Sequence, residues 1–289
     1  MAWRRATALV LVHLLHACGG EQADPSPAPG PYGWHPVGTP VELPALCNSI
    51  QIANDSIERV YAVRIALGTV SGECSALVLD ACTVRSCKSH GNNLTPSRSL
   101  GDITVTVAGS EVVVPIGEWF TSAPAPLWEG TATIDVQTSG ADLPPFQRTL
   151  VGPSAVDMIA PDFPPIGVRL AVDWDAPFEL TWSPGVADER VHATLSWSAP
   201  GGDFTTQGGF PDFYWTTVTC SFDAASGTGT IPAEALREVP TKPIGATKLE
   251  VSSLESSLVP FDGCDVAISA ENPARTATGW IAYAHVEPR

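Results

Sequence analysis

Short segments in which apolar and polar residues alternate, separated by turn residues, run through most of this chain of 289 residues. In "FELTW", Phe178, Leu180 and Trp182 fall on one side, because successive side chains of a β-strand point to opposite faces. The same period of two occurs in "YAVRIAL", "DITVTV", "ATIDV", "VHATLSW", "YWTTVTCSF" and "CDVAIS". The pattern predicts an all-β fold built of many short strands.

The C-terminal half has the features of an immunoglobulin-like β-sandwich. Trp182 and Trp197 lie on the apolar faces of their strands, in positions typical of a core. Cys220 and Cys264 each occupy an inward position on a different strand. We therefore expect a Cys220–Cys264 disulfide in this half.

The first 17 residues have the layout of a secretory signal peptide, with Arg4 and Arg5 before an apolar run too short to cross a bilayer. The run ends in "LHAC", which is similar to the lipobox of bacterial lipoproteins, although His16 replaces the usual small residue. In that family cleavage occurs just before the cysteine, which is then acylated. We expect Cys18 to begin the mature protein as its lipid anchor. The alternative is an ordinary signal peptide in which Cys18 has no such role.

The number of cysteines agrees with a lipidated Cys18. The chain has 7 Cys, an odd number, and lipidation of one leaves six, which can pair completely in an oxidising compartment. Besides the Cys220–Cys264 bond, two more disulfides are expected, in any of three pairings, among Cys47, Cys74, Cys82 and Cys87. The expected location is the bacterial cell envelope, at the outer membrane or cell surface rather than free in the periplasm.

Composition divides the chain into four regions. These are a signal peptide at 1–17, a lipidated cysteine with a Pro/Gly-rich tether at 18–44, an N-terminal Cys-rich β domain at 45–150 and the Ig-like sandwich at 151–289. The boundary between the two halves is placed in the Pro-punctuated stretch 145–165. One short helix is expected in "TIPAEALREVP", where Pro232 suits a first helical position and Pro240 ends the pattern.

Acidic residues outnumber basic ones, 31 to 15, for a formal net charge of −16. Loss of Arg4 and Arg5 with the leader leaves 13 basic residues and a net charge of −18. Polyanion binding depends on Lys and Arg, so this balance excludes nucleic acid as a partner. The expected partners are the membrane, through the N-terminal lipid, and a protein or glycan ligand.

The stretches "GECSALVLDACTVRSC", "GDITVTV", "PLWEGTATIDVQTSGADLPPF" and "VTCSFDAASGTGTIPAEAL" occur in an order that resembles uncharacterised lipoproteins of the myxobacterial type. The resemblance covers roughly residues 47–289 and rests on turn glycines, core apolar residues, cysteines and the short helix. It implies a lipid-anchored, all-β envelope protein with an Ig-like C-terminal half. It supplies no catalytic residue.

Two groups of residues have the chemistry of metal ligands. One has the spacing C-x7-C-x4-C-x2-H and comprises Cys74, Cys82, Cys87 and His90. It lacks the paired C-x2-C ends of structural zinc sites, so disulfides are favoured over zinc. Asp173 and Asp175 would share one face of a strand, where a calcium site is the alternative to a solvated strand end. We predict no metal and no cofactor.

No catalytic motif is recognisable, because G-x-S-x-G, H-E-x-x-H, P-loop and dinucleotide signatures are all missing. His35 and His192 lack a nucleophile or orienting carboxylate that the sequence can identify. Four tryptophans lie near turns or on the polar side of strands, where packing between the halves is favoured over sugar stacking: Trp34, Trp119, Trp128 and Trp215.

Three hypotheses for function follow. The first, which we favour, is a non-enzymatic envelope protein used for binding, adhesion or structure. The second is a secreted polysaccharide hydrolase acting through two carboxylates in a deep cleft. The third is a carbohydrate-binding module, which calls for a coplanar row of exposed tryptophans.

Overall fold

The computed structural model describes residues 33–42, 45–54, 63–67, 70–94, 98–118, 120–121, 126–165, 168–200, 213–240, 247–277 and 282–288. Across these ranges the chain is mostly β-structure, with one α-helix, α1 (Ala233–Arg237), and a 3-10 turn at Ala224–Ser226. The all-β fold with sheets packed face to face and one short helix, predicted from the sequence, is therefore confirmed. The leader and Cys18 lie outside the described residues.

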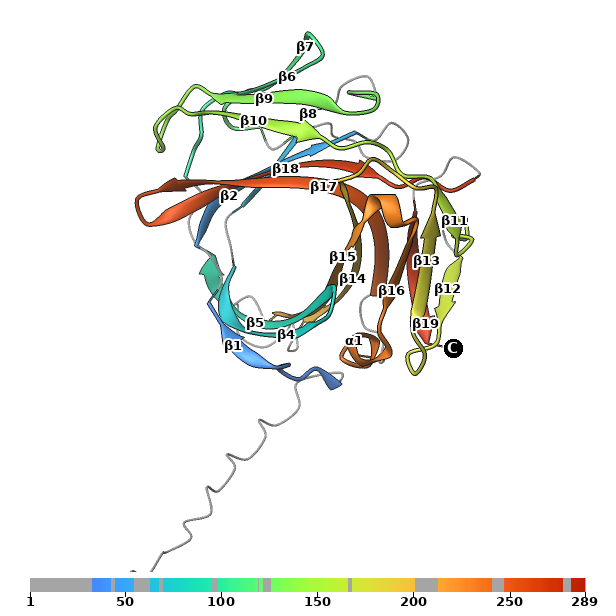
Figure 1. Cartoon of the computed structure of the whole chain (residues 1–289). Helices are drawn as coiled ribbons and strands as arrows, with labels where there is room; N and C mark the ends of the chain where they lie inside the picture. The colour runs from blue at the N-terminus through green and yellow to red at the C-terminus, as the bar shows by residue number, and fades with distance from the viewer. Residues whose placement is uncertain are drawn as a thin grey trace, which may run out of the picture.

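A large sheet of twelve strands forms the centre of the molecule (Figure 1). Its main path runs in the order β1 (Thr39–Val41), β4 (Val70–Leu79), β5 (Cys82–Leu94), β15 (Phe213–Asp223), β14 (Arg190–Pro200), β17 (Thr247–Phe261), β18 (Cys264–Pro273), β2 (Leu46–Ala53), β3 (Val63–Leu67) and β8 (Phe120–Thr121). Two further strands branch from β17: β19 (Tyr283–Pro288), which pairs with it, and β12 (Arg169–Val172), which pairs with β19.

Two smaller sheets pack on the outer side of this curved sheet (Figure 1). The first contains β10 (Gln147–Gly152), β9 (Ala132–Thr138), β6 (Ile103–Val107) and β7 (Ser110–Val114), in that order. The second contains β11 (Met158–Ala160), β13 (Phe178–Trp182) and β16 (Thr228–Ile231). Hairpin β6–β7 turns at Ala108 and Gly109, both at positive φ.

Each small sheet closes a hydrophobic core against the large one. The four-stranded sheet covers β2 and β18, where Ile50, Ile134 and Ile268 are fully buried. The three-stranded sheet and α1 cover β5, β15, β14 and β17, and there Trp182 and Trp197 are each 1% exposed. Burying a tryptophan removes about 200 Å² of mostly apolar surface from water, worth roughly 5 kcal/mol.

The boundary expected near residue 150 coincides with the passage from one small sheet to the other, between β10 and β11. The large sheet, however, extends across this boundary. Strand β5 of the N-terminal half pairs with β15, and β2 pairs with β18, so strands of both halves share one sheet. The alternation of apolar and polar residues predicts which residues form a strand, but it does not predict which other strand lies beside it in the sheet.

The segment expected to be the end of the tether is part of the folded body. Strand β1 pairs with β4, and Trp34 is 7% exposed, with its indole Nε1 donating to the carbonyl of Trp215 at 3.3 Å. Val37 is buried, and its backbone N–H donates to Ser75 Oγ at 2.8 Å. Proline-rich composition therefore overestimated the tether at its C-terminal end, because one apolar ring anchors this stretch to the core.

The helix expected in "TIPAEALREVP" is present as α1. Pro232 is the N-cap residue and the helix begins at Ala233, one position later than predicted. Ala235 and Leu236 are buried against the large sheet. The stretch 145–165, in which the boundary between the two halves is expected, contains strands β10 and β11.

Buried side-chain hydrogen bonds hold the crossing between the two small sheets. Trp128 Nε1 and Asn272 Nδ2 both donate to the carbonyl of Pro153, at 2.9 and 3.0 Å. Asn54 forms a reciprocal pair with the backbone of Trp128, at 2.8 and 3.0 Å. Because buried polar groups are costly without partners, this arrangement specifies one path for the crossing chain.

Six cysteines form three disulfides, each between neighbouring strands of the large sheet. The pairs are Cys47–Cys264 (β2 to β18), Cys74–Cys87 (β4 to β5) and Cys82–Cys220 (β5 to β15). The expected Cys220–Cys264 bond is wrong. Both residues face inward as predicted, but they lie in different cores, because β14 and β17 separate their strands in the sheet.

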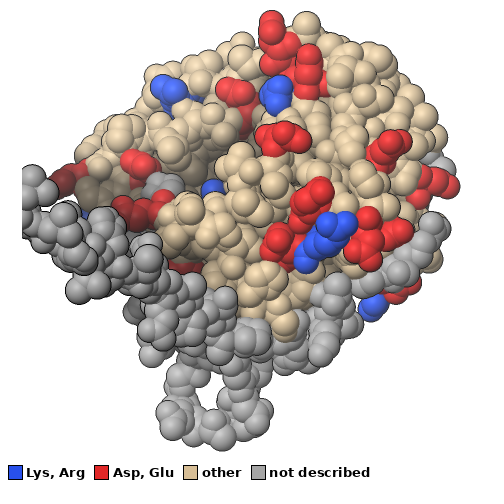
Figure 2. All heavy atoms as spheres, turned by 60° about the horizontal axis from the view of Figure 1, so that its bottom comes forward, with Lys and Arg blue, Asp and Glu red and all other residues tan. Residues whose placement is uncertain are grey.

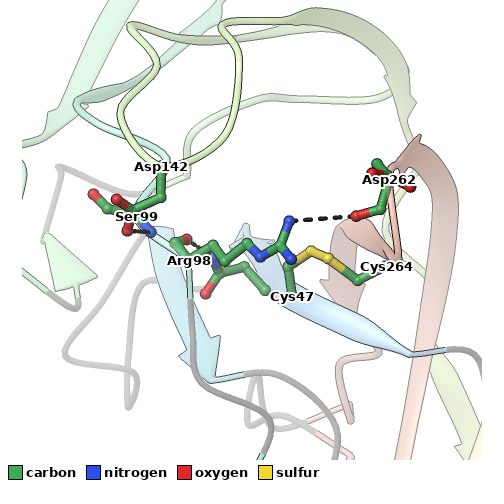
Figure 3. Close-up of a disulfide and its surroundings, with 7 residues drawn as sticks. Cys47, Arg98, Ser99, Asp142, Asp262 and Cys264 are labelled. Carbon is green, nitrogen blue, oxygen red and sulfur yellow. Dashed lines mark hydrogen bonds between the residues drawn. A yellow bond between two sulfur atoms is a disulfide. The ribbon is translucent and has the colours of Figure 1, made fainter.

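Figure 3 shows the surroundings of the Cys47–Cys264 bond, where the loop that leads into β6 passes beside the disulfide. Arg98 reaches across it and its Nη1 donates to the carbonyl of Asp262 at 3.3 Å, while its own carbonyl accepts from Asn48 Nδ2. The same loop is fixed by Ser99, whose N–H donates to Asp142 Oδ2 at 2.8 Å. The bond therefore lies at a junction of three segments distant in sequence.

We expect the disulfides to differ in their contribution to stability. Replacing Cys82 and Cys220 by Ala, in the full chain carrying Cys18→Ser, should lower the free energy of unfolding by about 5 kcal/mol. Replacing Cys74 and Cys87 should lower it by about 3 kcal/mol, because that bond closes a separation of 13 residues rather than 138. Urea denaturation of the two variants, with free-thiol titration to confirm that the remaining bonds are intact, measures the difference. A larger loss from the hairpin bond would contradict the expectation.

Candidate binding surface

The polar side of the large sheet is the broadest candidate surface. Every second side chain of its central strands lies in a core, so the alternate ones point to the opposite side, away from the two small sheets (Figure 1). Most side chains on this side are half-buried or exposed, whereas Cys87 and Ser252, which alternation places on the same side, are buried. We define the inner face by Thr83 and Arg85 of β5, Phe213, Trp215, Thr217 and Thr219 of β15, His192, Thr194, Ser196 and Ser198 of β14, Glu250 of β17, Ser269 and Glu271 of β18, and Ser49 and Gln51 of β2.

Strand register arranges hydroxyl groups in rows across the inner face. Thr194 lies opposite Thr219 on one side and Glu250 on the other, and Thr219 lies opposite Thr83. Neighbouring strands are about 4.8 Å apart and alternate residues of one strand about 6.6 Å apart. The result is a regular grid of groups that can both donate and accept hydrogen bonds.

His192 is the titratable group most affected by this surface. Burial lowers the pKa of its imidazole below the ordinary 6.5, and the neighbouring Arg190 cation lowers it further, while Glu271 opposes both effects. From the sequence alone, no orienting carboxylate could be identified for His192. The carboxylate in its company comes from β18, which is 79 positions away in the chain, and no local pattern connects the two.

Two aromatic side chains belong to the inner face, at the start of β15. The rings of Phe213 and Trp215 have their centroids 6.4 Å apart at an interplanar angle of 38°, and Phe213 is 42% exposed. Of the other tryptophans expected near turns, Trp34 and Trp128 are buried in the cores, which is the packing role that was favoured. Trp119 lies outside the described residues.

The possible metal ligands have other roles. Cys74, Cys82 and Cys87 are in disulfides, so they offer no thiolate, and the zinc alternative is wrong. The side chain of His90 lies outside the description. Within the part of the chain that the structure describes, no group of three or more His, Cys, Asp or Glu side chains is placed to hold a metal ion.

Asp173 and Asp175 do not share a strand face, because they follow the end of β12 in a turn. Asp173 Oδ1 accepts from the N–H of Asp175 at 2.9 Å, and Asp175 Oδ1 accepts from Arg237 Nε at 3.2 Å. The first carboxylate stabilises the turn and the second is paired with a cation. The interpretation as two neighbouring carboxylates on a strand was therefore wrong.

Figure 2 shows the side of the molecule that lies at the bottom of Figure 1. Asp and Glu are more frequent than Lys and Arg on this side, and a shaded hollow is visible left of centre. The excess of acidic over basic residues in the sequence is therefore also seen on this side of the surface. Among the described residues, no helix is long and apolar enough to cross a bilayer.

No protein-family profile and no curated protein sequence matches this chain.

The lowered pKa of His192 predicts a loss of stability in acid. The unfolded chain binds a proton at higher pH than the folded protein does, so the contribution is fully present above pH 6.5 and is lost as the pH falls toward the lowered pKa. We expect His192→Asn to reduce the difference in unfolding free energy between pH 7.5 and pH 5.5. Urea denaturation at both pH values measures it, with Thr219→Asn as the control on the same face. An unchanged difference in His192→Asn would show that other groups account for the acid sensitivity.

Proposed function

We propose that this chain is an exported, lipid-anchored protein of the bacterial cell envelope, at the outer membrane or cell surface. Its role is non-enzymatic binding, adhesion or structure, and the inner face is its binding surface. Two resemblances agree with this proposal: the motif order of roughly residues 47–289 resembles that of myxobacterial-type lipoproteins, and the leader ends in a lipobox-like sequence.

One observation carries the proposal. Six of the seven cysteines are paired in disulfides, and Cys18, in its lipobox-like context, is the remaining one. Structural disulfides are typical of exported proteins and rare in the reducing cytosol. The pairing therefore supports both export and a separate role for Cys18.

The proposed tether is shorter than the 18–44 expected from the sequence. Since residues 33–42 belong to the fold, residues 18–32 remain for the spacer. Fully extended at about 3.1 Å per residue, they would reach roughly 47 Å. That length gives the body clearance from the membrane while keeping it close to the surface.

Exchange of Cys18 tests the anchor. We expect Cys18→Ser, expressed as the full chain in a bacterial host, to abolish incorporation of labelled palmitate and to move the protein from the membrane fraction to the supernatant. The physical reason is that acyl chains supply the membrane affinity. Mass spectrometry of the native product identifies the first residue and its lipid. Membrane association and processing unchanged by the substitution would refute the lipid anchor.

The binding role of the inner face is tested separately, with envelope fragments. The full chain carrying Cys18→Ser should co-sediment with fragments of the host envelope, and Thr217→Val on the inner face should weaken this binding. Thr133→Val on the outer side of β9 is the matched control, because it makes the same exchange on the opposite side of the molecule. Equal binding by both variants would exclude the inner face.

A polysaccharide hydrolase is the second candidate. Glu271 acts on the pKa of His192, so one carboxylate and an imidazole are brought together on the inner face, and Glu250 belongs to the same face. If this candidate is right, the protein releases new reducing ends from polysaccharide, and Glu271→Gln reduces the rate by at least about a hundredfold. Release at background level by the folded protein would exclude it and leave the binding role.

A further inference from the structure

The end of the inner face at the start of β15 combines two kinds of surface. Phe213 and Trp215 present their rings side by side on one strand. Register places Ser198 directly opposite Trp215, and Ser196 opposite Thr217, the next inner-face residue of β15. An aromatic pair therefore borders directly on a row of hydroxyl groups.

This combination restricts the chemistry of a ligand. An apolar ligand would cover the hydroxyl groups without satisfying them, at a cost of about 1–3 kcal/mol for each one left unpaired. A strongly anionic ligand would be repelled by a protein of net charge −16. A ligand suited to both parts needs hydroxyl groups at its rim and an apolar face for the rings.

Sugar rings meet both requirements. A pyranose has C–H bonds on its faces and hydroxyl groups around its edge, so it can lie on an aromatic ring and hydrogen-bond to Ser and Thr at the same time. The repeating hydroxyl rows of neighbouring strands would extend such contacts beyond one ring. A chain of sugars fits the grid better than a single sugar does.

We propose that the inner face binds an uncharged polysaccharide, with Phe213 and Trp215 as its stacking platform. Ser196, Ser198 and Thr217 hydrogen-bond to the hydroxyl groups of the bound chain. This inference rests on the proposed role of the inner face as the binding surface, and it names the ligand class.

Affinity electrophoresis tests the proposal directly. The full chain carrying Cys18→Ser is run in native gels that contain hydroxyethylcellulose, galactomannan or xylan as uncharged probes, and alginate as the anionic one. We expect at least one uncharged polysaccharide to retard the protein and alginate not to. Retardation by alginate alone, or by none of the four at any concentration used, would overturn the proposal.

Substitutions then locate the binding site. Phe213→Ala and Trp215→Ala should each weaken binding by about tenfold, and Trp215→Phe should restore part of it by keeping a ring. The bond from Trp34 goes to the backbone carbonyl of Trp215, so these exchanges leave that acceptor in place. Thr217→Val should also weaken binding, and Thr133→Val should not. Circular dichroism and free-thiol titration confirm that each variant is folded.

The outcomes separate this inference from the proposed function. Binding to a polysaccharide that is unaffected in folded Phe213→Ala and Trp215→Ala would place the glycan elsewhere and refute the stacking platform. Binding to envelope fragments through the inner face, abolished by protease treatment of the fragments and without affinity for the soluble polysaccharides, would identify a protein partner. That result would retain the proposed function and overturn the glycan inference.

Discussion

Strands from the two halves of this chain meet at two places in one sheet, and a disulfide holds each meeting point. Cys82–Cys220 joins β5 to β15, and Cys47–Cys264 joins β2 to β18, across separations of 138 and 217 residues. The four C-terminal strands between them are therefore enclosed by N-terminal strands on both sides. Bringing residues so distant in sequence together lowers the conformational entropy of the chain, which opposes folding. A disulfide at each place already restricts the unfolded chain, so less entropy is lost when the protein folds.

The rest of the architecture follows from the outer side of this sheet. Two small sheets and α1 cover it and form the cores, so its alternate residues must be apolar. Between the small sheets the chain crosses on a path fixed by Trp128, Asn272 and the carbonyl of Pro153. Gly152 stands beside this crossing, and a side chain there would come within 3.0 Å of the Trp128 ring. The close packing of Gly152 against Trp128 thus connects the two cores at this crossing.

In the described part of the chain, the small sheets and α1 cover one side of the large sheet, and the inner face lies on the other side. The inner face has the polar composition of a surface, but its groups are ordered by strand register into rows. An ordered array of hydroxyl groups and rings gives specificity through geometry rather than charge. This suits a protein whose acidic surface disfavours polyanions.

The sequence by itself determined the strands, because period-two alternation requires only local information. "FELTW", "VHATLSW" and "CDVAIS" each became a strand with the expected residues buried, or partly buried in the case of Phe178, and "TIPAEALREVP" became the helix. It also identified the inward positions of Cys220 and Cys264. The tertiary structure alone decided their partners, since β14 and β17 lie between them, and it alone brought Glu271 near His192 and Phe213 and Trp215 beside the hydroxyl rows. Pairing between distant strands depends on the energy of the whole sheet, and no short stretch of residues contains that information.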